Sequence, residues 1–254
     1  MRYTEKLMLN WEEFYFAAPS GWWQPNPSRT IFYYDFEDSN NRLADTSWNN
    51  NDATSATYIT YSQESWQYVA ETTNTSWWID IPGSYWSTIG TWDFAMSCWV
   101  YIENPWSRAY PCLFAVRYDW WNANSCIWFD PNNTISDSYP SWSWVKREFL
   151  DGAVCYKWTI DPTTLYNWWH NFVMTRNNWT VTCYIDTNID ISFTETWTFP
   201  NAWNWCLLSR PTTWAPQSFP AWAKWDKFIL ENVWRSQQNV TDYFNQTKSL
   251  YGIS

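Results

Sequence analysis

The sequence is poor in glycine and histidine, and both shortages restrict its chemistry. It has 254 residues, of which 5 are glycine and 1 is histidine. Ordinary domains contain about 7% glycine, or roughly 18 residues at this length. No glycine-rich phosphate loop occurs. Because His170 is the only histidine, a Ser-His-Asp or Cys-His site has one possible base. We interpret His170 as a strand residue beside Trp169 rather than as a catalyst.

Positive charge and long apolar runs are also scarce. Lys and Arg number 15 against 25 Asp and Glu, which gives a net charge of -10 and a sequence pI near 4.5. Such a surface repels the phosphates of nucleic acids and anionic membranes, and this argues against both partners. No run of about 18 uncharged apolar residues exists, so no membrane insertion is predicted. The first ten residues, with Arg2, Glu5 and Lys6, lack the apolar core of a secretory signal.

The six cysteines lie far apart and form no C-x-x-C pair, so their spacing gives no zinc site. Each lies within an apolar stretch, and we interpret them mostly as small buried residues. One or two disulfides are the alternative. The cysteines are Cys98, Cys112, Cys126, Cys155, Cys183 and Cys206.

Alternation of apolar and polar residues recurs along the chain and predicts strands that bury one face. Clusters of Asn, Asp, Ser, Thr and Pro separate these segments, as expected of an all-β domain. A short helix is predicted over Gln237–Tyr251, where Ser236 can cap the first turn. The predicted strands are Thr30–Phe36, Tyr58–Tyr61, Phe94–Ile102, Cys112–Arg117, Cys126–Asp130, Ala153–Ile160, Trp169–Arg176, Thr180–Asp186, Ile189–Phe193 and Trp205–Ser209.

Residues 1–29 differ from the rest because prolines, serines and a glycine between Pro19 and Ser28 prevent a central strand or helix. We predict a linker there, preceded at Leu7–Ala17 by a small hairpin or an assembly arm. Residues 30–254 are predicted to form one domain, since sandwiches of this size commonly fold as a single unit.

Four blocks of sequence resemble, in order, the laminin-G-like jelly rolls of the concanavalin A-like lectin/glucanase superfamily. Tyr33–Thr54 contains Asp-Thr-Ser-Trp-Asn-Asn-Asn-Asp, which is similar to the family's Asp-x-Ser-Gly-Asn-x-Asn-Asp. Thr91–Tyr101 resembles the strand whose tryptophan, here Trp99, packs in the core. Trp169–Asp186 is similar to the paired strands with a Trp-His start and a Tyr-x-Asp end, and Trp225–Asn232 to the closing strand.

This resemblance implies a two-sheet antiparallel jelly-roll β-sandwich used for adhesion and for glycan or protein binding, often with a calcium ion. The oxygen-rich loop that would hold calcium contains Asp45, Asn49, Asn51 and Asp52, and Asp226 resembles an acidic position in the closing strand. The alternative, which we prefer, is that Asp and Asn build the turn by bonding their own backbone.

The glucanases of this superfamily carry two catalytic carboxylates in a Glu-x-Asp-x-x-Glu string, so that an acid and a nucleophile flank the glycosidic bond. No such string occurs here. The most similar segment, Asp35–Asp38, lies in the opening strand and belongs to the wrong block. We therefore predict no catalytic residues and no enzyme activity.

The chain has 27 tryptophans, and several occupy positions where the backbone calls for glycine. Trp179 follows Asn178 in a tight hairpin that would take Asn-Gly, and Trp48, Trp92 and Trp11 lie where relatives carry glycine. We hypothesise that many of these tryptophans correspond to UGA codons of an organism that reads UGA as glycine. They appear as tryptophan because the gene was translated with a code that reads UGA as tryptophan. Sugar-stacking platforms and simple core packing are the alternatives. Trp99 and Trp169, on alternating strands, are expected to be genuine.

These observations lead to three hypotheses of function. The first is a non-enzymatic binding or adhesion module that recognises a glycan or protein on a virion or cell surface. The second is a structural protein, such as a phage tail or capsid decoration, in which residues 1–29 join a neighbouring copy into a homo-oligomer. The third, ranked last, is a divergent glycoside hydrolase.

Overall fold

The computed structural model describes the chain in segments. The described residues between 26 and 103, between 159 and 194 and between 223 and 254 include side chains. The remaining described segments are described by their backbone. The described residues are 7–9, 12–14, 26, 28–57, 59–64, 67–72, 78–82, 93–101, 103, 112–117, 123–128, 143–149, 152–157, 159–160, 162–194, 204–207, 209–210, 217–218 and 223–254.

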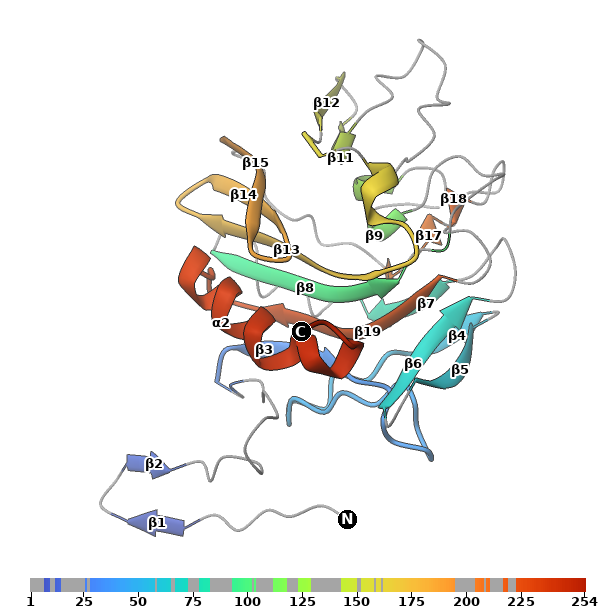
Figure 1. Ribbon diagram of the computed structural model, residues 1–254, viewed down its shortest axis with the longest axis vertical. Helices are drawn as coiled ribbons and strands as arrows, with labels where there is room; N and C mark the ends of the chain where they lie inside the picture. Colours follow the sequence, from blue (N-terminus) through green and yellow to red (C-terminus); the bar gives the residue numbers. More distant parts are fainter. Residues whose placement is uncertain are drawn as a thin grey trace.

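The larger of two sheets is antiparallel throughout and contains eight strands in the described part of the chain (Figure 1). One strand, β3 (Thr30–Tyr34), pairs with β19 outside the main order. The main order is β15 (Asn188–Thr194), β14 (Thr180–Ile185), β13 (Trp169–Asn177), β8 (Phe94–Tyr101), β19 (Lys224–Glu231), β6 (Gln67–Thr72) and β5 (Ile59–Glu64).

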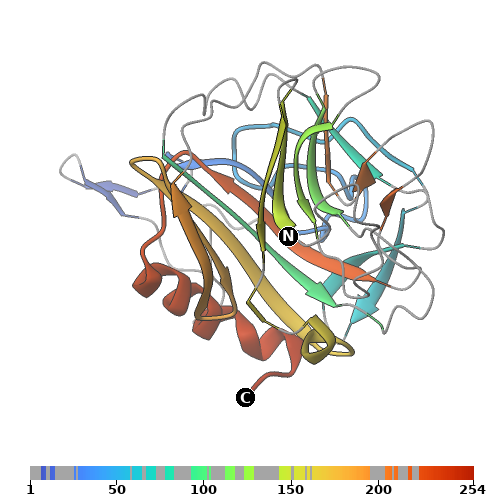
Figure 2. The ribbon, with the colours of Figure 1, turned by 90° about the horizontal axis from the view of Figure 1, so that it is seen from above.

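The smaller sheet is also antiparallel and has seven described strands, packed against one face of the larger sheet (Figure 2). Two short ribbons pair β1 (Leu7–Leu9) with β2 (Glu12–Phe14), and β17 (Ser209–Arg210) with β18 (Gln217–Ser218). The order of the smaller sheet is β12 (Gly152–Lys157), β11 (Ser143–Phe149), β10 (Ala123–Trp128), β9 (Cys112–Arg117), β16 (Asn204–Leu207), β7 (Trp78–Pro82) and β4 (Ser55–Thr57).

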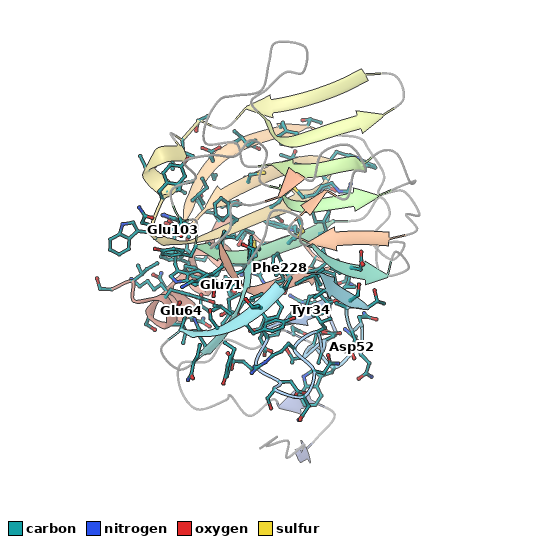
Figure 3. The ribbon with its side chains drawn as sticks, turned by 90° about the vertical axis from the view of Figure 1, so that its right-hand side faces the viewer. Tyr34, Asp52, Glu64, Glu71, Glu103 and Phe228 are labelled. Atoms are coloured by element: carbon teal, nitrogen blue, oxygen red, sulfur yellow. The ribbon has the colours of Figure 1, made fainter. Side chains whose placement is uncertain are left out.

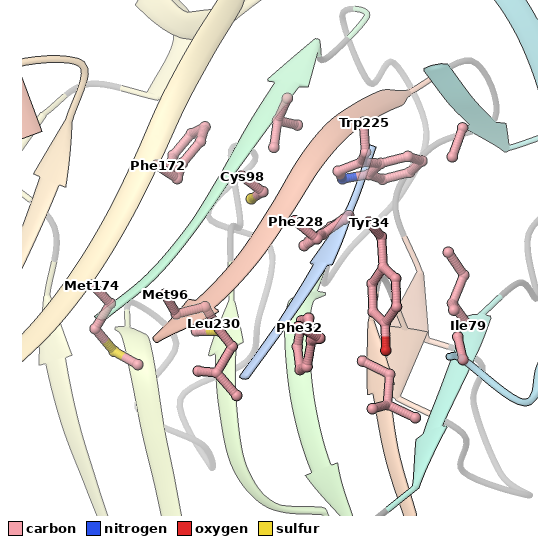
Figure 4. Close-up of a cluster of buried hydrophobic side chains, with 14 of the residues drawn as sticks. Phe32, Tyr34, Ile79, Met96, Cys98, Phe172, Met174, Trp225, Phe228 and Leu230 are labelled. Carbon is pink, nitrogen blue, oxygen red and sulfur yellow. The ribbon is translucent and has the colours of Figure 1, made fainter. Parts of the chain in front are cut away.

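The core lies between the sheets, where alternate side chains of four adjacent strands point to the same side (Figure 4). Burial of each such large apolar side chain contributes about 1.5–3 kcal/mol to folding. From the opposite sheet, Ile79 and Ile81 of β7 also belong to the cluster. The side chains from β3, β8, β13 and β19 are Phe32, Tyr34, Met96, Cys98, Phe172, Met174, Trp225, Phe228 and Leu230.

The outer face of the larger sheet carries the C-terminal helical segment, formed by α2 (Gln237–Thr247) and the 3₁₀ turn η2 (Lys248–Tyr251) (Figure 1). Ser236 caps the first turn of α2, as predicted, and Asn239 completes a capping box. Beneath the segment, Trp99 stacks on Tyr251 with ring centroids 4.2 Å apart. Among the described residues, none of the helices has both the length and the apolar character needed to cross a membrane.

The predicted architecture, an all-β two-sheet antiparallel sandwich with a short C-terminal helix, is confirmed. Cys112–Arg117 is a strand with the predicted bounds. The prediction missed β4, β6, β7, β11 and β18. In β6 the alternation is hidden because two of the buried positions, Gln67 and Thr72, are polar.

The hairpin between β13 and β14 has the predicted two-residue turn. Asn178 and Trp179 have φ angles of 46° and 71°, which are the left-handed angles that a type I′ turn requires. Trp48 has a φ of 79°. By contrast, Trp99 and Trp169 are buried strand residues, as expected. Trp11 and Trp92 lie outside the described residues.

Two cysteines have described side chains, and both are free and buried. Burial raises the pKa values of the Cys98 and Cys183 thiols above the usual range of a cysteine. Both therefore behave as the small buried apolar residues that the sequence predicted. The side chains of the other four cysteines lie outside the described residues.

Candidate functional site

The predicted oxygen-rich loop is held together by its own hydrogen bonds. The Asp45 carboxylate, 8% exposed, accepts hydrogen bonds from the backbone N–H groups of Tyr33 (2.8 Å), Ser47 (2.9 Å) and Asn51 (2.9 Å), and from the Ser47 hydroxyl (2.9 Å). The Asp52 carboxylate accepts one from the Asp45 N–H at 2.7 Å. The structure therefore brings Asp45 and Asp52 together in a closed turn of the kind that Asp and Asn favour.

Two asparagines fasten this loop to the opening strand. The Asn49 side-chain amide donates to the carbonyl of Thr30, and the Asn51 amide donates to the carbonyl of Ile31 at 2.6 Å. Within the described residues, no group of three or more His, Cys, Asp or Glu side chains is arranged to hold a metal ion. The contacts agree with the turn interpretation, and calcium at this loop stays a prediction.

Asp226 has different partners from the loop, because it lies at a bulge of β19 beneath the C-terminal helical segment. Lys227, the next residue, has a left-handed φ of 54°, and the pairing of β19 with β8 shifts register there. The Asp226 carboxylate accepts a hydrogen bond of 2.7 Å from the Tyr251 hydroxyl and lies 3.4 Å from the Lys227 ammonium. Burial raises the pKa of Asp226 to about 6, although Lys227 opposes the rise.

Lys227 is the internal cation of this buried acidic region. Burial lowers its pKa, but the negative charge of Asp226, together with smaller contributions from Asp35 and Glu37, outweighs burial and the pKa is raised. Burial also raises the pKa of Asp35 and Glu37, and Lys227 opposes both rises. This role was not predicted, although a charged Asp-Lys pair inside the apolar closing strand was the available signal in the sequence.

His170 is a strand residue, as the sequence predicted. Its Nδ1 lies 2.9 Å from the Asp186 carboxylate, whose other oxygen accepts the Asn171 N–H at 2.9 Å. The bond joins the Trp-His start of β13 to the Tyr-x-Asp end of β14, two features of the family resemblance. Asp186 orients the imidazole and fastens the corner between the two strands.

A row of polar side chains crosses the outer face of the larger sheet beside the helical segment. Lys224 on β19 pairs in register with Tyr101 on β8 and with Glu71 on β6. Residues paired across antiparallel strands point to the same face, so the three side chains are neighbours. Glu64, on the adjacent edge strand β5, forms an ion pair with the Lys224 ammonium. We call Tyr101, Lys224, Glu71 and Glu64 the outer-face patch.

The outer-face patch combines an aromatic ring with charged groups at half-buried positions. The Lys224 ammonium lies 5.5 Å from the centroid of the Tyr101 ring, and the Lys224 and Glu64 side chains are 23% and 35% exposed. Glu103, an exposed residue two positions after Tyr101, lies on the same side of the molecule as Glu64 and Glu71 (Figure 3). The patch was not predicted from the sequence, because β6, which supplies Glu71, was itself not predicted.

Comparison with known proteins identifies structural relatives only. No family model and no curated protein sequence matches the chain. A solved structure of domain 4 of the extracellular GH43 arabinanase AbnA from Geobacillus stearothermophilus, in complex with arabinotriose, is similar with a TM-score of 0.58 and 18% identity. The match covers 84% of this chain and 97% of that domain.

Two larger proteins contain similar domains. A sialidase mutant of Trypanosoma rangeli that displays trans-sialidase activity matches with a TM-score of 0.61 and 10% identity, over 89% of this chain and 34% of that one. A structure of botulinum neurotoxin type C, whose cell entry is described as dependent on two ganglioside molecules, matches with a TM-score of 0.57 and 12% identity, over 86% and 51%. These likenesses show the β-sandwich fold, and the laminin-G-like assignment stays a prediction.

Proposed function

We propose that the chain is a non-enzymatic binding module of the concanavalin A-like lectin type, which recognises a glycan or protein on a virion or cell surface. The outer-face patch is the observation that carries this proposal. It presents the Tyr101 ring, the Lys224 ammonium and the carboxylates of Glu71 and Glu64 on four adjacent strands.

This arrangement suits a glycan because the two kinds of group match the two surfaces of a sugar. An aromatic ring packs against the apolar face of a pyranose or furanose, while carboxylates accept hydrogen bonds from its hydroxyls and an ammonium donates to them. The groups stand on paired strands rather than on a loop, so little ordering is needed when a ligand binds. The arabinanase domain, solved with arabinotriose, supports the proposal as a similar fold that holds a neutral sugar.

The test is a glycan array together with a cell-binding assay on the full chain. We expect specific signals that Tyr101→Ala and Lys224→Ala each reduce at least tenfold. Thr182→Ala is the matched control, because Thr182 lies on β14 of the same sheet, away from the patch, and its hydroxyl lies 3.1 Å from the hydroxyl of Ser192. Blank results in both assays would overturn the proposal. Turnover of a polysaccharide that is lost on changing one carboxylate would replace it with a glycoside hydrolase.

A structural or assembly role is the second candidate, and the ribbon of β1 and β2 favours it. Figures 1 and 2 show this ribbon apart from the sandwich, and an isolated two-stranded ribbon is marginally stable unless another surface covers it. Deletion of residues 1–29 should then convert an oligomer into a monomer in light scattering. A monomeric full chain would argue against this role.

A further inference from the structure

We infer that the ligand of the outer-face patch is an uncharged glycan. This inference rests on the proposed function and concerns the same site. The patch has one cation, Lys224, and two carboxylates, Glu64 and Glu71, with Glu103 on the same side (Figure 3). Its only cation is already paired with Glu64.

An acidic sugar meets two obstacles at this patch. Its carboxylate must take Lys224 from Glu64, and it must then lie beside Glu71 and whichever carboxylate it displaced. Two like charges at contact distance repel by about 1 kcal/mol even in water, which is about a fivefold loss of affinity for each carboxylate. The net charge of -10 adds a long-range repulsion that slows the approach of an anion.

A neutral sugar meets neither obstacle. Its hydroxyls donate hydrogen bonds to the carboxylates of Glu64 and Glu71 while the ion pair with Lys224 stays in place. The ring of Tyr101 supplies apolar contact that does not depend on charge. None of the four residues is a tryptophan, so the inference is independent of how the tryptophans are interpreted.

The experiment compares neutral glycans with their sialylated or uronic acid counterparts on one array, at low and at physiological salt. We expect the neutral member of each pair to bind at least fivefold better, with little effect of salt on the neutral member. Glu71→Gln should reduce the preference about fivefold, and Thr182→Ala should leave it unchanged. Stronger binding of the acidic members would overturn this inference and leave the binding function intact. An array that is blank for both classes, with no cell binding, would overturn both.

A separate observation, the φ angle at two tryptophans, points to glycine at positions 48 and 179 in the natural protein. The φ angles of 79° at Trp48 and 71° at Trp179 lie in the left-handed region, where a bulky side chain is strained and glycine is not. Other residues share this region. Asparagine and aspartate tolerate it, as at Asn50, Asn167, Asn178 and Asp186. Phe36 and Lys227 are held there by the core packing of the one and the ion pair of the other with Asp226.

Exposure distinguishes these two tryptophans from those that pack in the core. Trp48 and Trp179 are 60% and 37% exposed, whereas Trp99 and Trp225 are 0% exposed and pack within the sandwich. The Trp48 side chain is strained and largely in solvent, so it contributes little to the fold. At position 179 the Arg176 guanidinium, 5.6 Å from the ring centroid, favours tryptophan and opposes the strain. Reading UGA as glycine accounts for both positions and for the shortage of 5 glycines against 27 tryptophans.

Two measurements test this second inference: the codons of the gene and the peptide masses of the natural protein. We expect UGA at positions 48 and 179, UGG at positions 99 and 225, and peptides from the natural source whose masses correspond to glycine at the first two. UGG at position 48 or 179 would overturn the inference, and so would UGA at position 99, because glycine cannot fill the space that Trp99 occupies against Tyr251.

Discussion

The Tyr251 hydroxyl donates a hydrogen bond of 2.7 Å to the Asp226 carboxylate, and this bond fastens η2 to the bulge of β19. Tyr251→Phe removes the donor and leaves a buried carboxylate oxygen with one fewer partner. We expect the free energy of unfolding to fall by about 1–3 kcal/mol in urea titrations. Ser249→Ala, an exposed change in the same 3₁₀ turn, should have almost no effect. Equal losses in the two variants would contradict the assigned role.

The raised pKa of Asp226 predicts that stability depends on pH. The folded chain holds this proton up to a pH of about 6, whereas in the unfolded chain the carboxyl has its ordinary pKa of 3.8. Between these values the folded state binds more protons, so the free energy of unfolding falls as the pH rises from about 4 to 6. The raised pKa values of Asp35 and Glu37 act in the same direction.

Asp226→Asn should remove the part of this dependence that belongs to Asp226, which is roughly 3 kcal/mol at most for a shift of about two pH units. Asparagine still accepts the Tyr251 hydrogen bond, so the variant should fold. Urea titrations at several pH values between 4 and 7 make the measurement. Identical slopes for the variant and the original chain would contradict the assignment.

The contacts of the Asp45 carboxylate predict that its removal strongly destabilises the fold and that calcium does not stabilise it. Asp45→Ala leaves four donors without their acceptor, and we expect a loss of about 3 kcal/mol or more. Because those donors occupy Asp45 and because Lys227 accompanies Asp226, calcium should leave the melting temperature unchanged. A rise in melting temperature with calcium that Asp226→Ala abolishes would establish the metal site instead.

Much of the fold was predictable because its signals are local. Period-2 alternation located β8, β9 and β13, and Ser236 located the start of α2. The outer-face patch was not predictable because it depends on register. Tyr101, Glu71 and Lys224 are distant in sequence and meet only when β8, β19 and β6 pair in one alignment. The cation at Lys227 was hidden for a similar reason, since its contacts depend on a bulge and a left-handed φ.

The backbone strain at two exposed tryptophans gives the last prediction. Trp48→Gly relieves a φ of 79° and should raise the free energy of unfolding by about 1 kcal/mol. Trp179→Gly should gain less, because the Arg176 guanidinium lies 5.6 Å from the Trp179 ring centroid and that contact is lost.

Two control variants separate relief of strain from a general effect of glycine. Trp168 is 65% exposed and does not have a positive φ, so Trp168→Gly should lower stability by up to about 1 kcal/mol, because glycine gives the unfolded chain more freedom. Trp99→Gly empties a fully buried site and should cost about 3–5 kcal/mol or prevent folding. Thermal and urea unfolding of the four variants measure these differences. A loss at position 48 as large as that at position 168 would show that the left-handed backbone there does not favour glycine.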